Sequence, residues 1–254
     1  MKVLITGASS GIGRDLAREF AKKKYDLVIT ARSEDKLNEL KAELEKNYNV
    51  DVKTEVLDLN LEENCYLLYE NNKDIDILVN NAGFGEFGEF VDTNLEKELS
   101  LIKINITAVH ILTKLYLKDM VKKNKGIILN VSSIAGNMPG PLMAAYYASK
   151  AYVLRLSEGI REELKRKKSK VKISVLQPGP VNTNFNNVAN VKFNLKGKSS
   201  EYVAKYTLNK LLKGKFNIVP GLEIKCTKFF AKIIPNNIMA KMCYNVQQSK
   251  KGAR

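Results

Sequence analysis

Short apolar runs alternate with longer segments of mixed polarity along the 254-residue chain. The apolar runs are rich in Val, Ile and Leu, which is typical of strands buried on both faces of a parallel sheet. The longer segments repeat apolar residues every three or four positions, as amphipathic helices do; Leu37, Leu40 and Leu44 share one such face. The two patterns alternate about six times, which predicts an α/β fold: a doubly wound, mostly parallel sheet with helices on both faces.

The boundaries of the elements follow from where each pattern begins and ends. Strands are expected at residues 2–6, 25–30, 50–57, 75–79, 126–131, 171–176 and 216–219. Helices are expected at residues 14–24, 34–48, 61–72, 95–122, 146–168 and 201–213. No linker or repeat interrupts the alternation, so residues 1–221 are predicted to form one domain. Residues 222–254 are predicted to be a basic, amphipathic helical extension of the same domain, broken at Pro235.

A loop rich in glycine and serine joins the first expected strand to the first expected helix. It runs from Thr6 to Gly13, with its glycines spaced G-x-x-x-G-x-G. Glycines allow a backbone to approach a ligand closely, and the N-terminus of the following helix offers free N–H groups and a positive dipole end. The loop is therefore a candidate phosphate cradle, although a plain tight turn would have the same composition.

The residues after the second strand bear on which dinucleotide would bind. In open α/β sheets a carboxylate at this place suits the ribose 2′-hydroxyl of NAD, and a cation suits the 2′-phosphate of NADP. Ala31 and Arg32 stand there, and Asp35 falls too late, inside the next expected helix. Arg32 therefore indicates NADP preference, unless it is simply a solvated charge. Asp58 and Leu59 follow the third strand, where ligands of such sheets lie.

Tyr146 and Lys150 lie four residues apart in the helix expected at 146–168, so they share one face. A free tyrosine titrates about three pH units above neutrality, and a nearby ammonium lowers its pKa. A tyrosine tuned in this way can protonate an alkoxide or deprotonate an alcohol. Ser133 follows a buried strand and could hold the substrate oxygen beside that tyrosine. A surface Tyr and Lys on an amphipathic helix would have the same spacing, so the motif gains weight only from its context.

The formal net charge of +15 comes from 42 basic and 27 acidic residues. Such an excess attracts anions, including phosphorylated cofactors and anionic lipids, although a lysine-rich solvated surface is the favoured explanation. Nucleic-acid binding is not expected, because no basic cluster is interleaved with aromatic residues. Three scattered cysteines and one histidine favour reduced thiols in a cytoplasm and no metal site. Neither a secretory leader nor a membrane-spanning stretch is expected.

Seven motifs occur along the chain in a fixed order. They are T-G-x-x-x-G-I-G at 6–13, D-L at 58–59, N-N-A-G at 80–83, the helical Asn105, N-V-S-S-I-A-G at 130–136, Y-x-x-x-K at 146–150 and P-G-P-V-x-T at 178–183. Each is weak alone, but the set is specific when it occurs in order with strand–turn–helix context. Over about residues 1–221, the chain resembles the single-domain branch of the short-chain dehydrogenase/reductase family. The resemblance implies a Rossmann-type fold and NAD(P)-dependent hydride transfer.

The resemblance also implies roles for the matching residues. Tyr146 would be the acid/base, Lys150 would lower the pKa of that tyrosine and hold the nicotinamide ribose, and Ser133 would anchor the carbonyl. Asn105 would support a water that relays protons. NADP is the implied cofactor, and its implied binding residues are Gly7, Ser9, Ser10, Gly11, Ile12, Gly13, Arg32, Asp58, Leu59, Asn81, Gly83, Tyr146, Lys150, Pro178, Gly179, Val181 and Thr183. Ser10 is a departure, since many NADP-preferring relatives carry a basic residue there.

The expected function is NADP-dependent transfer of a hydride between the nicotinamide and a carbonyl or alcohol substrate. Phe84, Phe87 and Phe90, in the loop after the fourth strand, favour an apolar or lipid-like substrate. A homodimer or homotetramer in the cytoplasm is expected. The alternatives are a non-catalytic NADP-binding scaffold or membrane-surface protein of the same fold, a nucleic-acid binder, and an epimerase or dehydratase of the extended branch. The presence of both Tyr146 and Lys150 argues against the scaffold.

Two segments admit other interpretations. Residues 184–200 are polar and have no clear period, which is typical of a mobile lid over a pocket. The tail helices are expected to cover the substrate pocket, to pack against a partner subunit, or to lie on an anionic membrane surface. Their two expected apolar faces, with lysines between them, consist of Phe229, Phe230, Ile233 and Ile234, and of Ile238, Met239 and Met242.

Overall fold

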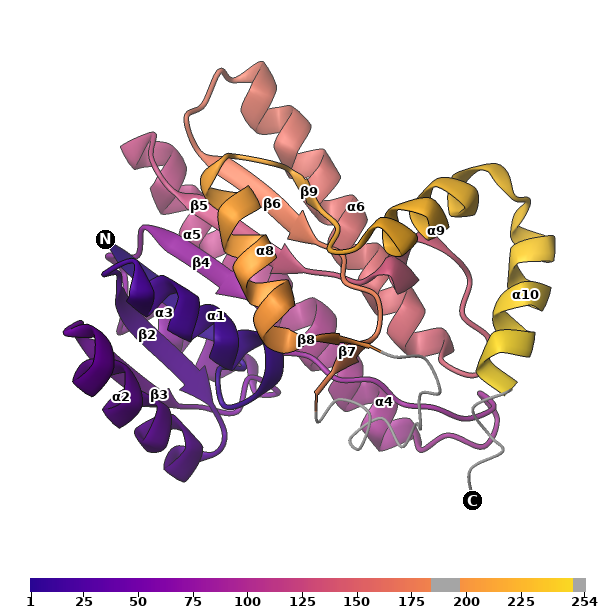
Figure 1. The fold of residues 1–254 in the computed structure, drawn as a ribbon, viewed down its shortest axis with the longest axis horizontal. Coiled ribbons are helices and arrows are strands. Elements are labelled where there is room, and N and C mark those ends of the chain that lie inside the picture. Colours follow the sequence, from indigo (N-terminus) through magenta and orange to yellow (C-terminus); the bar gives the residue numbers. More distant parts are fainter. Residues whose placement is uncertain (184–196, 249–254) are drawn as a thin grey trace.

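A seven-stranded parallel sheet lies at the centre of the computed structural model, which describes residues 1–183 and 197–248. Its strands are β1 (Lys2–Thr6), β2 (Asp26–Ala31), β3 (Val52–Val56), β4 (Ile77–Asn80), β5 (Ile127–Val131), β6 (Lys172–Leu176) and β9 (Asn217–Ile218). Their order is β3-β2-β1-β4-β5-β6-β9, and every neighbouring pair is parallel (Figure 1). The direction of winding therefore reverses between β1 and β4. Two short strands outside this sheet, β7 (Val181–Asn182) and β8 (Lys198–Ser199), pair with each other.

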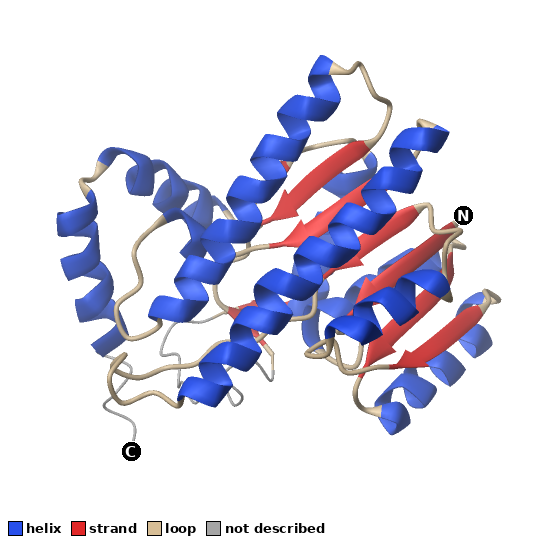
Figure 2. Ribbon diagram, turned by 180° about the vertical axis from the view of Figure 1, so that it is seen from behind, coloured by secondary structure: helices blue, strands red, loops and turns tan. Residues whose placement is uncertain are grey.

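Helices cover both faces of the sheet. They are α1 (Gly11–Lys22), α2 (Glu34–Tyr48), α3 (Glu62–Glu70), α4 (Leu95–Ile102), α5 (Val109–Lys123), α6 (Ala144–Arg166), α8 (Ser200–Leu212), α9 (Leu222–Ile233) and α10 (Asn236–Gln248), with a π-helical turn η1 (Lys103–Ala108) and a 3₁₀ turn η2 (Ile134–Asn137). Helices α1, α2 and α8 pack on one face, and α3, α5 and α6 pack on the other (Figures 1 and 2). The predicted doubly wound α/β arrangement is confirmed.

Successive side chains of each strand enter opposite cores. Val3 and Ile5 of β1 join a core with Leu16 of α1, whereas Leu4 between them joins a core with Leu112 of α5. All five side chains are almost completely buried. Burial on both faces explains why the strands are continuous apolar runs in the sequence rather than alternating ones.

Three of the differences from the expected helix boundaries concern the residues of the predicted site. Helix α1 begins at Gly11, because the last glycines of the loop already belong to its first turn. Helix α6 begins at Ala144, so Tyr146 lies inside its first turn rather than at its start. The helix expected at 95–122 is interrupted by η1, a wider turn that contains Asn105.

Two buried asparagines tie neighbouring strands to the helices above them. Asn80 of β4 donates from Nδ2 to Asn130 Oδ1 of β5 at 2.9 Å and to Thr113 Oγ1 of α5 at 3.0 Å. Asn130 donates in turn to Ser157 Oγ of α6 at 3.0 Å. The chain of hydrogen bonds satisfies these groups where water cannot reach them, although the Asn80 Oδ1 atom has no partner.

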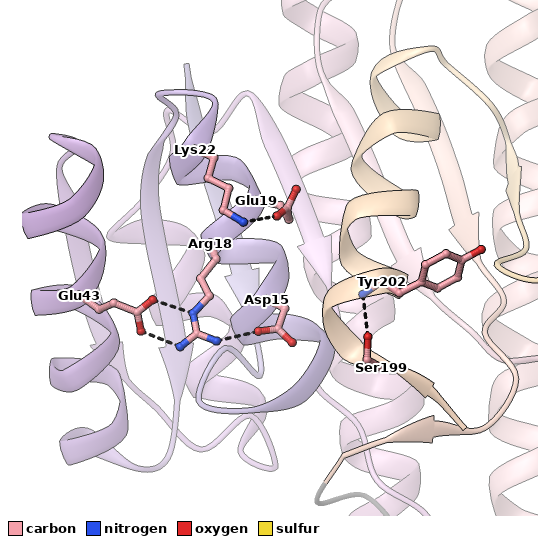
Figure 3. A network of polar contacts seen from close by, with 7 residues as sticks. All are labelled: Asp15, Arg18, Glu19, Lys22, Glu43, Ser199 and Tyr202. Atoms are coloured by element: carbon pink, nitrogen blue, oxygen red, sulfur yellow. Dashed lines mark hydrogen bonds and ion pairs between the residues drawn. The ribbon is translucent and has the colours of Figure 1, made fainter. Parts of the chain in front are cut away.

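An arginine joins α1 to α2 (Figure 3). The Arg18 guanidinium donates two hydrogen bonds of 2.7 Å to the Glu43 carboxylate and one of 2.9 Å to Asp15. The bidentate pairing holds the pKa of Glu43 below its ordinary value, because it favours the charged carboxylate. A cleft of about 390 Å³ separates this cluster from the start of α8, where Ser199 caps the helix by accepting from Tyr202 N at 3.2 Å.

The tail forms the two expected helices, α9 and α10, with Pro235 between them. Each expected apolar face is only partly exposed, because Ile234 is half-buried and Met239 is buried while the other members stay at the surface. Ile234 and Met239 pack inward near Met138. Within the described part of the chain, no helix is both long and apolar enough to cross a membrane. The apolar residues of the expected faces that point outward are Phe229, Phe230, Ile233, Ile238 and Met242.

We expect Asn130→Ala to lower the free energy of unfolding by about 2–4 kcal/mol, because it leaves Asn80 and Ser157 without their shared partner in a dry interior. Urea unfolding followed by circular dichroism measures the change. Asn245→Ala, at an exposed position of α10, is the control and should alter stability by less than about 0.5 kcal/mol. Equal stability of the two variants would show that the buried amides contribute little.

Candidate active site

Ser133, Tyr146 and Lys150 meet at the carboxyl edge of the sheet, beyond β5. Ser133 closely follows β5 and begins η2, where its Oγ accepts a hydrogen bond from Ala135 N at 3.1 Å. Tyr146 and Lys150 lie about one turn apart in α6. The Tyr146 hydroxyl is hydrogen-bonded to the Ser133 hydroxyl. Two hydroxyl groups thus lie together at the edge where parallel sheets bind their ligands.

The Lys150 side chain is buried against the ring of Tyr146. Only 5% of Lys150 is exposed, its Nζ donates to Val131 O at 3.0 Å, and Nζ lies 5.8 Å from the centroid of the Tyr146 ring. Burial lowers the pKa of Lys150 to about 8, because a poorly solvated environment disfavours the charged amine. Gly83 leaves room for this group, since a Cβ built on Gly83 would lie 3.2 Å from Nζ.

The Tyr146 phenol is harder to ionise in this structure than in water. Burial of the hydroxyl raises the pKa of Tyr146 to about 12, and the Ser133 hydrogen bond offsets only part of the rise. The ring retains some exposed surface, but its hydroxyl end is enclosed. This direction is opposite to the lowering expected from the sequence. The reason is that burial desolvates the phenol, while the Lys150 amine donates its hydrogen bond to Val131 O rather than to the phenol oxygen.

Asn105 clamps the loop after β4 to the first turns of α6. Its Oδ1 accepts from Phe84 N at 3.1 Å, while its Nδ2 donates to Phe84 O at 2.9 Å and to Ser149 Oγ at 3.0 Å. Ser149 in turn donates to Tyr146 O at 2.7 Å. Asn105 is completely buried, so these bonds position the surroundings of Tyr146. Its expected support of a relay water stays a prediction, and Ser149 is a participant that the motifs do not indicate.

The loop between β1 and α1 exposes its backbone to one side. Gly7 and Gly11 have φ angles of +66° and +54°, which other residues rarely adopt. A Cβ on Gly13 would collide with Gly7 O, so this glycine permits the tight turn. Ser9 and Ser10 lie in the turn, and the Ser10 side chain makes no capping bond to α1. The Ser10 hydroxyl therefore does not compete with an anion for the first N–H groups of α1.

Asn81 holds the same loop from the neighbouring strand. Its Nδ2 donates to Thr6 O at 2.9 Å and to Gly7 O at 3.1 Å, and its backbone N donates to Thr6 Oγ1 at 2.9 Å. Both hydrogens of the Asn81 side-chain amide are therefore donated to carbonyl groups of the loop. The predicted place of Asn81 along the cofactor stays a prediction. Ile12 likewise packs its side chain against the core that α1 shares with α2 and α8.

Three further expected cofactor residues lie at the ends of β2 and β3. Arg32 immediately follows β2, and its side chain is exposed. Asp58 shapes the turn after β3, where its Oδ1 accepts from Asn60 N at 3.0 Å. Leu59 is buried in the core beneath that turn. The structure thus brings an exposed cation and a structured turn to the same edge of the sheet as the glycine loop.

The segment that follows β6 closes the other side of the site. Pro178 O accepts a hydrogen bond from Ser133 Oγ at 3.4 Å. Thr183 lies against the glycine loop, since a Cβ on Gly11 would lie 2.9 Å from Thr183 Cγ2. The Ser133 hydroxyl and the glycine loop are therefore linked through the short stretch of chain that carries the P-G-P-V-x-T motif.

A cavity of about 130 Å³ lies beside this segment. Gly179 and Val181 line it, together with Ile224 from the tail helix α9. Most of the lid expected at residues 184–200 lies outside the described residues. Its last residues form β8 and the start of α8.

The end of the tail reaches the first turn of α6 through a contact that the sequence does not predict. Gln247 of α10 is buried, and its Nε2 donates to the Tyr147 hydroxyl at 2.7 Å. The Tyr147 ring lies over Gly140, and its centroid is 6.1 Å from that of the Tyr146 ring. A glutamine on the same helical stripe as Met239 and Cys243 is the signal that could have indicated this contact.

One edge of the sheet therefore combines a hydroxyl pair, a buried amine and a glycine loop shaped to receive phosphate. Such a set can hold a dinucleotide and move a proton to or from an oxygen atom. In the described ranges, no group of three His, Cys, Asp or Glu side chains is placed to hold a metal ion.

Comparison with known sequences points to one family. The profile of the short chain dehydrogenases matches residues 1–192. The very-long-chain 3-oxoacyl-CoA reductase of Mus musculus is 36% identical over 177 residues, covering 65% of this chain and 54% of that protein. The protein of the same name from Anas platyrhynchos is 38% identical over 171 residues, covering 65% of this chain and 55% of that protein. The chain thus spans about half the length of the curated relatives it matches.

Solved structures agree over a larger part of the chain. A short-chain dehydrogenase from Sphingobium yanoikuyae in complex with NADPH is 29% identical, with a TM-score of 0.84 and 94% of each chain covered. An alcohol dehydrogenase from Thermococcus sibiricus complexed with 5-hydroxy-NADP is 27% identical, with a TM-score of 0.74, and the match covers 86% of this chain and 94% of that one. The family expected from the ordered motifs is confirmed: the chain belongs to the short-chain dehydrogenase/reductase family, whose members are NAD(P)-dependent oxidoreductases.

Proposed function

We propose that this protein is an NADP-dependent oxidoreductase that transfers a hydride between the nicotinamide and an apolar or lipid-like carbonyl or alcohol substrate. The observation that carries the proposal is the hydroxyl pair of Tyr146 and Ser133, placed beside the buried amine of Lys150. A phenol that lies next to a second hydroxyl and an ammonium suits proton exchange with a carbonyl oxygen.

The glycine loop fits a dinucleotide. Gly7, Gly11 and Gly13 permit a tight backbone turn, because a Cβ at these positions would meet Ala82, Thr183 and Gly7 O respectively. The N-terminus of α1 adds backbone N–H groups that the Ser10 side chain does not cap and that suit the pyrophosphate, and Arg32 offers a cation to the 2′-phosphate of NADP. Lys150 would hold the nicotinamide ribose, and Val181 and Thr183 would meet the nicotinamide carboxamide.

A bound nicotinamide dinucleotide supplies or accepts the hydride. In reduction, the Ser133 hydroxyl holds the carbonyl oxygen, and Tyr146 gives that oxygen a proton as negative charge develops on it. A pKa of about 12 keeps the proton on Tyr146 at neutral pH, where it is ready for donation. Lys150, which is charged at pH 7 with a pKa of about 8, then stabilises the phenolate that donation leaves behind.

The substrate class rests on two lines of support. Relatives at 36–38% identity are named very-long-chain 3-oxoacyl-CoA reductases, which makes a 3-oxoacyl thioester the first substrate to test. In addition, the backbone N of Phe84 donates to Asn105 Oδ1 next to the site, and Phe90 of the same loop is exposed. A non-catalytic scaffold of the same fold is the rival function, and loss of activity in a Tyr146 variant would exclude it.

Tyr146→Phe should reduce kcat by at least about a thousandfold with NADPH and a medium-chain 3-oxoacyl-CoA, because proton donation to the oxygen is lost. NADPH binding, followed by fluorescence titration, should change little. Tyr152→Phe is the matched control, because that tyrosine lies on the same helix but bonds only to the exposed His110. Comparable activity of Tyr146→Phe and wild type would remove Tyr146 from the mechanism.

Lys150→Met should abolish turnover yet raise the Tm at pH 7. The reason is that the folded protein must keep an amine charged where burial has lowered its pKa from 10.5 to about 8. Between pH 8 and 10.5 the folded wild-type protein loses this proton before the unfolded chain does, so its stability rises with pH and the advantage of the variant shrinks. Calorimetry across this range measures the difference.

Lys46→Met, at an exposed position of α2, controls for loss of a surface charge and should show no such trend. A Tm difference between Lys150→Met and wild type that stays constant with pH would mean that side-chain shape, rather than charge, is responsible.

Arg32→Ala should lower the ratio of kcat/KM for NADPH over NADH by about 10- to 100-fold, which corresponds to loss of a charge-assisted contact worth about 1.5–3 kcal/mol. The kcat/KM with NADH should stay close to that of the wild-type protein, because NADH has no 2′-phosphate. Steady-state kinetics with both cofactors test this, with Lys46→Ala as the control. An unchanged ratio would place the cofactor preference elsewhere in the site.

A further inference from the structure

An exposed apolar stripe follows the outer side of α9. Its members recur at the spacing of one helical face, and their exposed fractions run from 54% for Phe230 to 74% for Leu222. The exposed Cys226 continues the stripe. The apolar residues of the stripe are Leu222, Phe229, Phe230 and Ile233.

A second stripe follows α10. Ile238, Met242 and Val246 are spaced four residues apart, and each is about half exposed. The first stripe ends at Ile233 and the second begins at Ile238, so the two adjoin at the bend between the helices. Two adjoining stripes of large apolar side chains need a partner, because soluble surfaces seldom leave such a patch open to water.

The inner side of the same helices rests on the candidate active site. Ile224 of α9 lies directly against Gly179, and both line the small cavity beside Val181. Gln247 of α10 bonds to Tyr147, the neighbour of Tyr146. A surface that covers the outer stripes would therefore be separated from the site by only the thickness of one helix, about 10–12 Å with side chains.

The charges around the stripes favour an anionic partner over a second copy of the chain. Lys225, Lys232 and Lys241 are exposed on α9 and α10. Glu223 is the one acidic residue of these helices, and Lys198 of β8 neutralises it at 3.1 Å. A two-fold interface between two copies would bring the same lysines face to face, at an electrostatic cost. Apolar stripes flanked by lysines match the boundary between the headgroups and acyl chains of an anionic bilayer.

We propose that the outer face of α9 and α10 docks the protein on an anionic lipid surface, with the apolar stripes inserted at the headgroup level and the lysines on the phosphates. The docked face lies over the cavity at Gly179, so a lipid-like substrate would pass from the membrane to the site along the tail. That second step rests on the proposed function, whereas docking itself requires neither cofactor nor substrate.

Sedimentation of the full-length protein with vesicles tests the docking. Vesicles of equal parts phosphatidylglycerol and phosphatidylcholine should bind the protein, and vesicles of phosphatidylcholine alone should bind it much more weakly. Binding to the anionic vesicles should weaken as salt is raised. No cofactor or substrate is present, so failure of the proposed reaction would leave this result unaffected.

Phe229→Ser with Phe230→Ser should weaken vesicle binding by at least about tenfold, because two exposed aromatic anchors are lost. Tyr66→Ser with Leu67→Ser is the matched control, since these neighbours on α3 are exposed to a similar degree but lie away from the tail. The control should bind vesicles like wild type. Equal binding by the two double variants would overturn the proposal.

A second pair of variants keeps the test decisive if the phenylalanine variant proves unstable. Lys232→Gln with Lys241→Gln should weaken binding to anionic vesicles by about fivefold per lysine, from about 1 kcal/mol for each charge near the surface. Circular dichroism melting should show that these exposed substitutions leave the fold intact.

Three results would contradict the docking of the tail on lipid. The first is absence of wild-type binding to anionic vesicles. The second is a wild-type dimer, seen by analytical ultracentrifugation, that the Phe229 and Phe230 substitutions dissociate, which would assign the stripes to a second copy. The third is that the wild-type protein binds an acidic carrier protein under conditions in which it does not bind anionic vesicles.

Discussion

The site depends on a positive charge held where water is scarce. Lys150 is almost completely buried, and one backbone carbonyl, Val131 O, accepts from its amine at 3.0 Å. Such a group costs stability unless its surroundings are arranged around it. The arrangement is visible in Gly83, whose missing side chain leaves room for the amine, and in Asn105, which fastens the neighbouring loop. Burial thereby places the charge beside the ring of Tyr146, at a cost to the stability of the fold.

Much of this site follows from local sequence patterns. The spacing of Tyr146 and Lys150 puts them on one helical face, and a buried strand followed by Ser133 puts the serine at the carboxyl edge of the sheet. Alternating apolar runs and amphipathic segments predict the parallel sheet, because its strands are buried on both faces. These features are predictable because each depends on residues that are close in the chain.

What the sequence did not indicate depends on contacts between distant segments. Gln247 meets Tyr147 across 100 residues, and no local pattern specifies that pairing. The inward side of the tail helices is also set by such contacts, since Met239 is buried near Met138. The same reason applies to the pKa of Tyr146, which burial raises although the spacing of Tyr146 and Lys150 predicts that it is lowered. Charge can be counted from a sequence, whereas desolvation requires the packed structure.

The π-helical turn η1, which contains Asn105, fixes the rotation of helix α5 relative to helix α4. Upstream of it, α4 carries the exposed residues Leu95 and Leu99, and downstream of it, α5 packs Leu112 against the sheet. Each hydrogen bond of a π-helix spans one residue more than that of an α-helix, so η1 sets how far α5 is rotated about the helix axis relative to α4. That rotation lets one continuous element carry apolar residues at the surface before Asn105 and in the sheet-facing core after it.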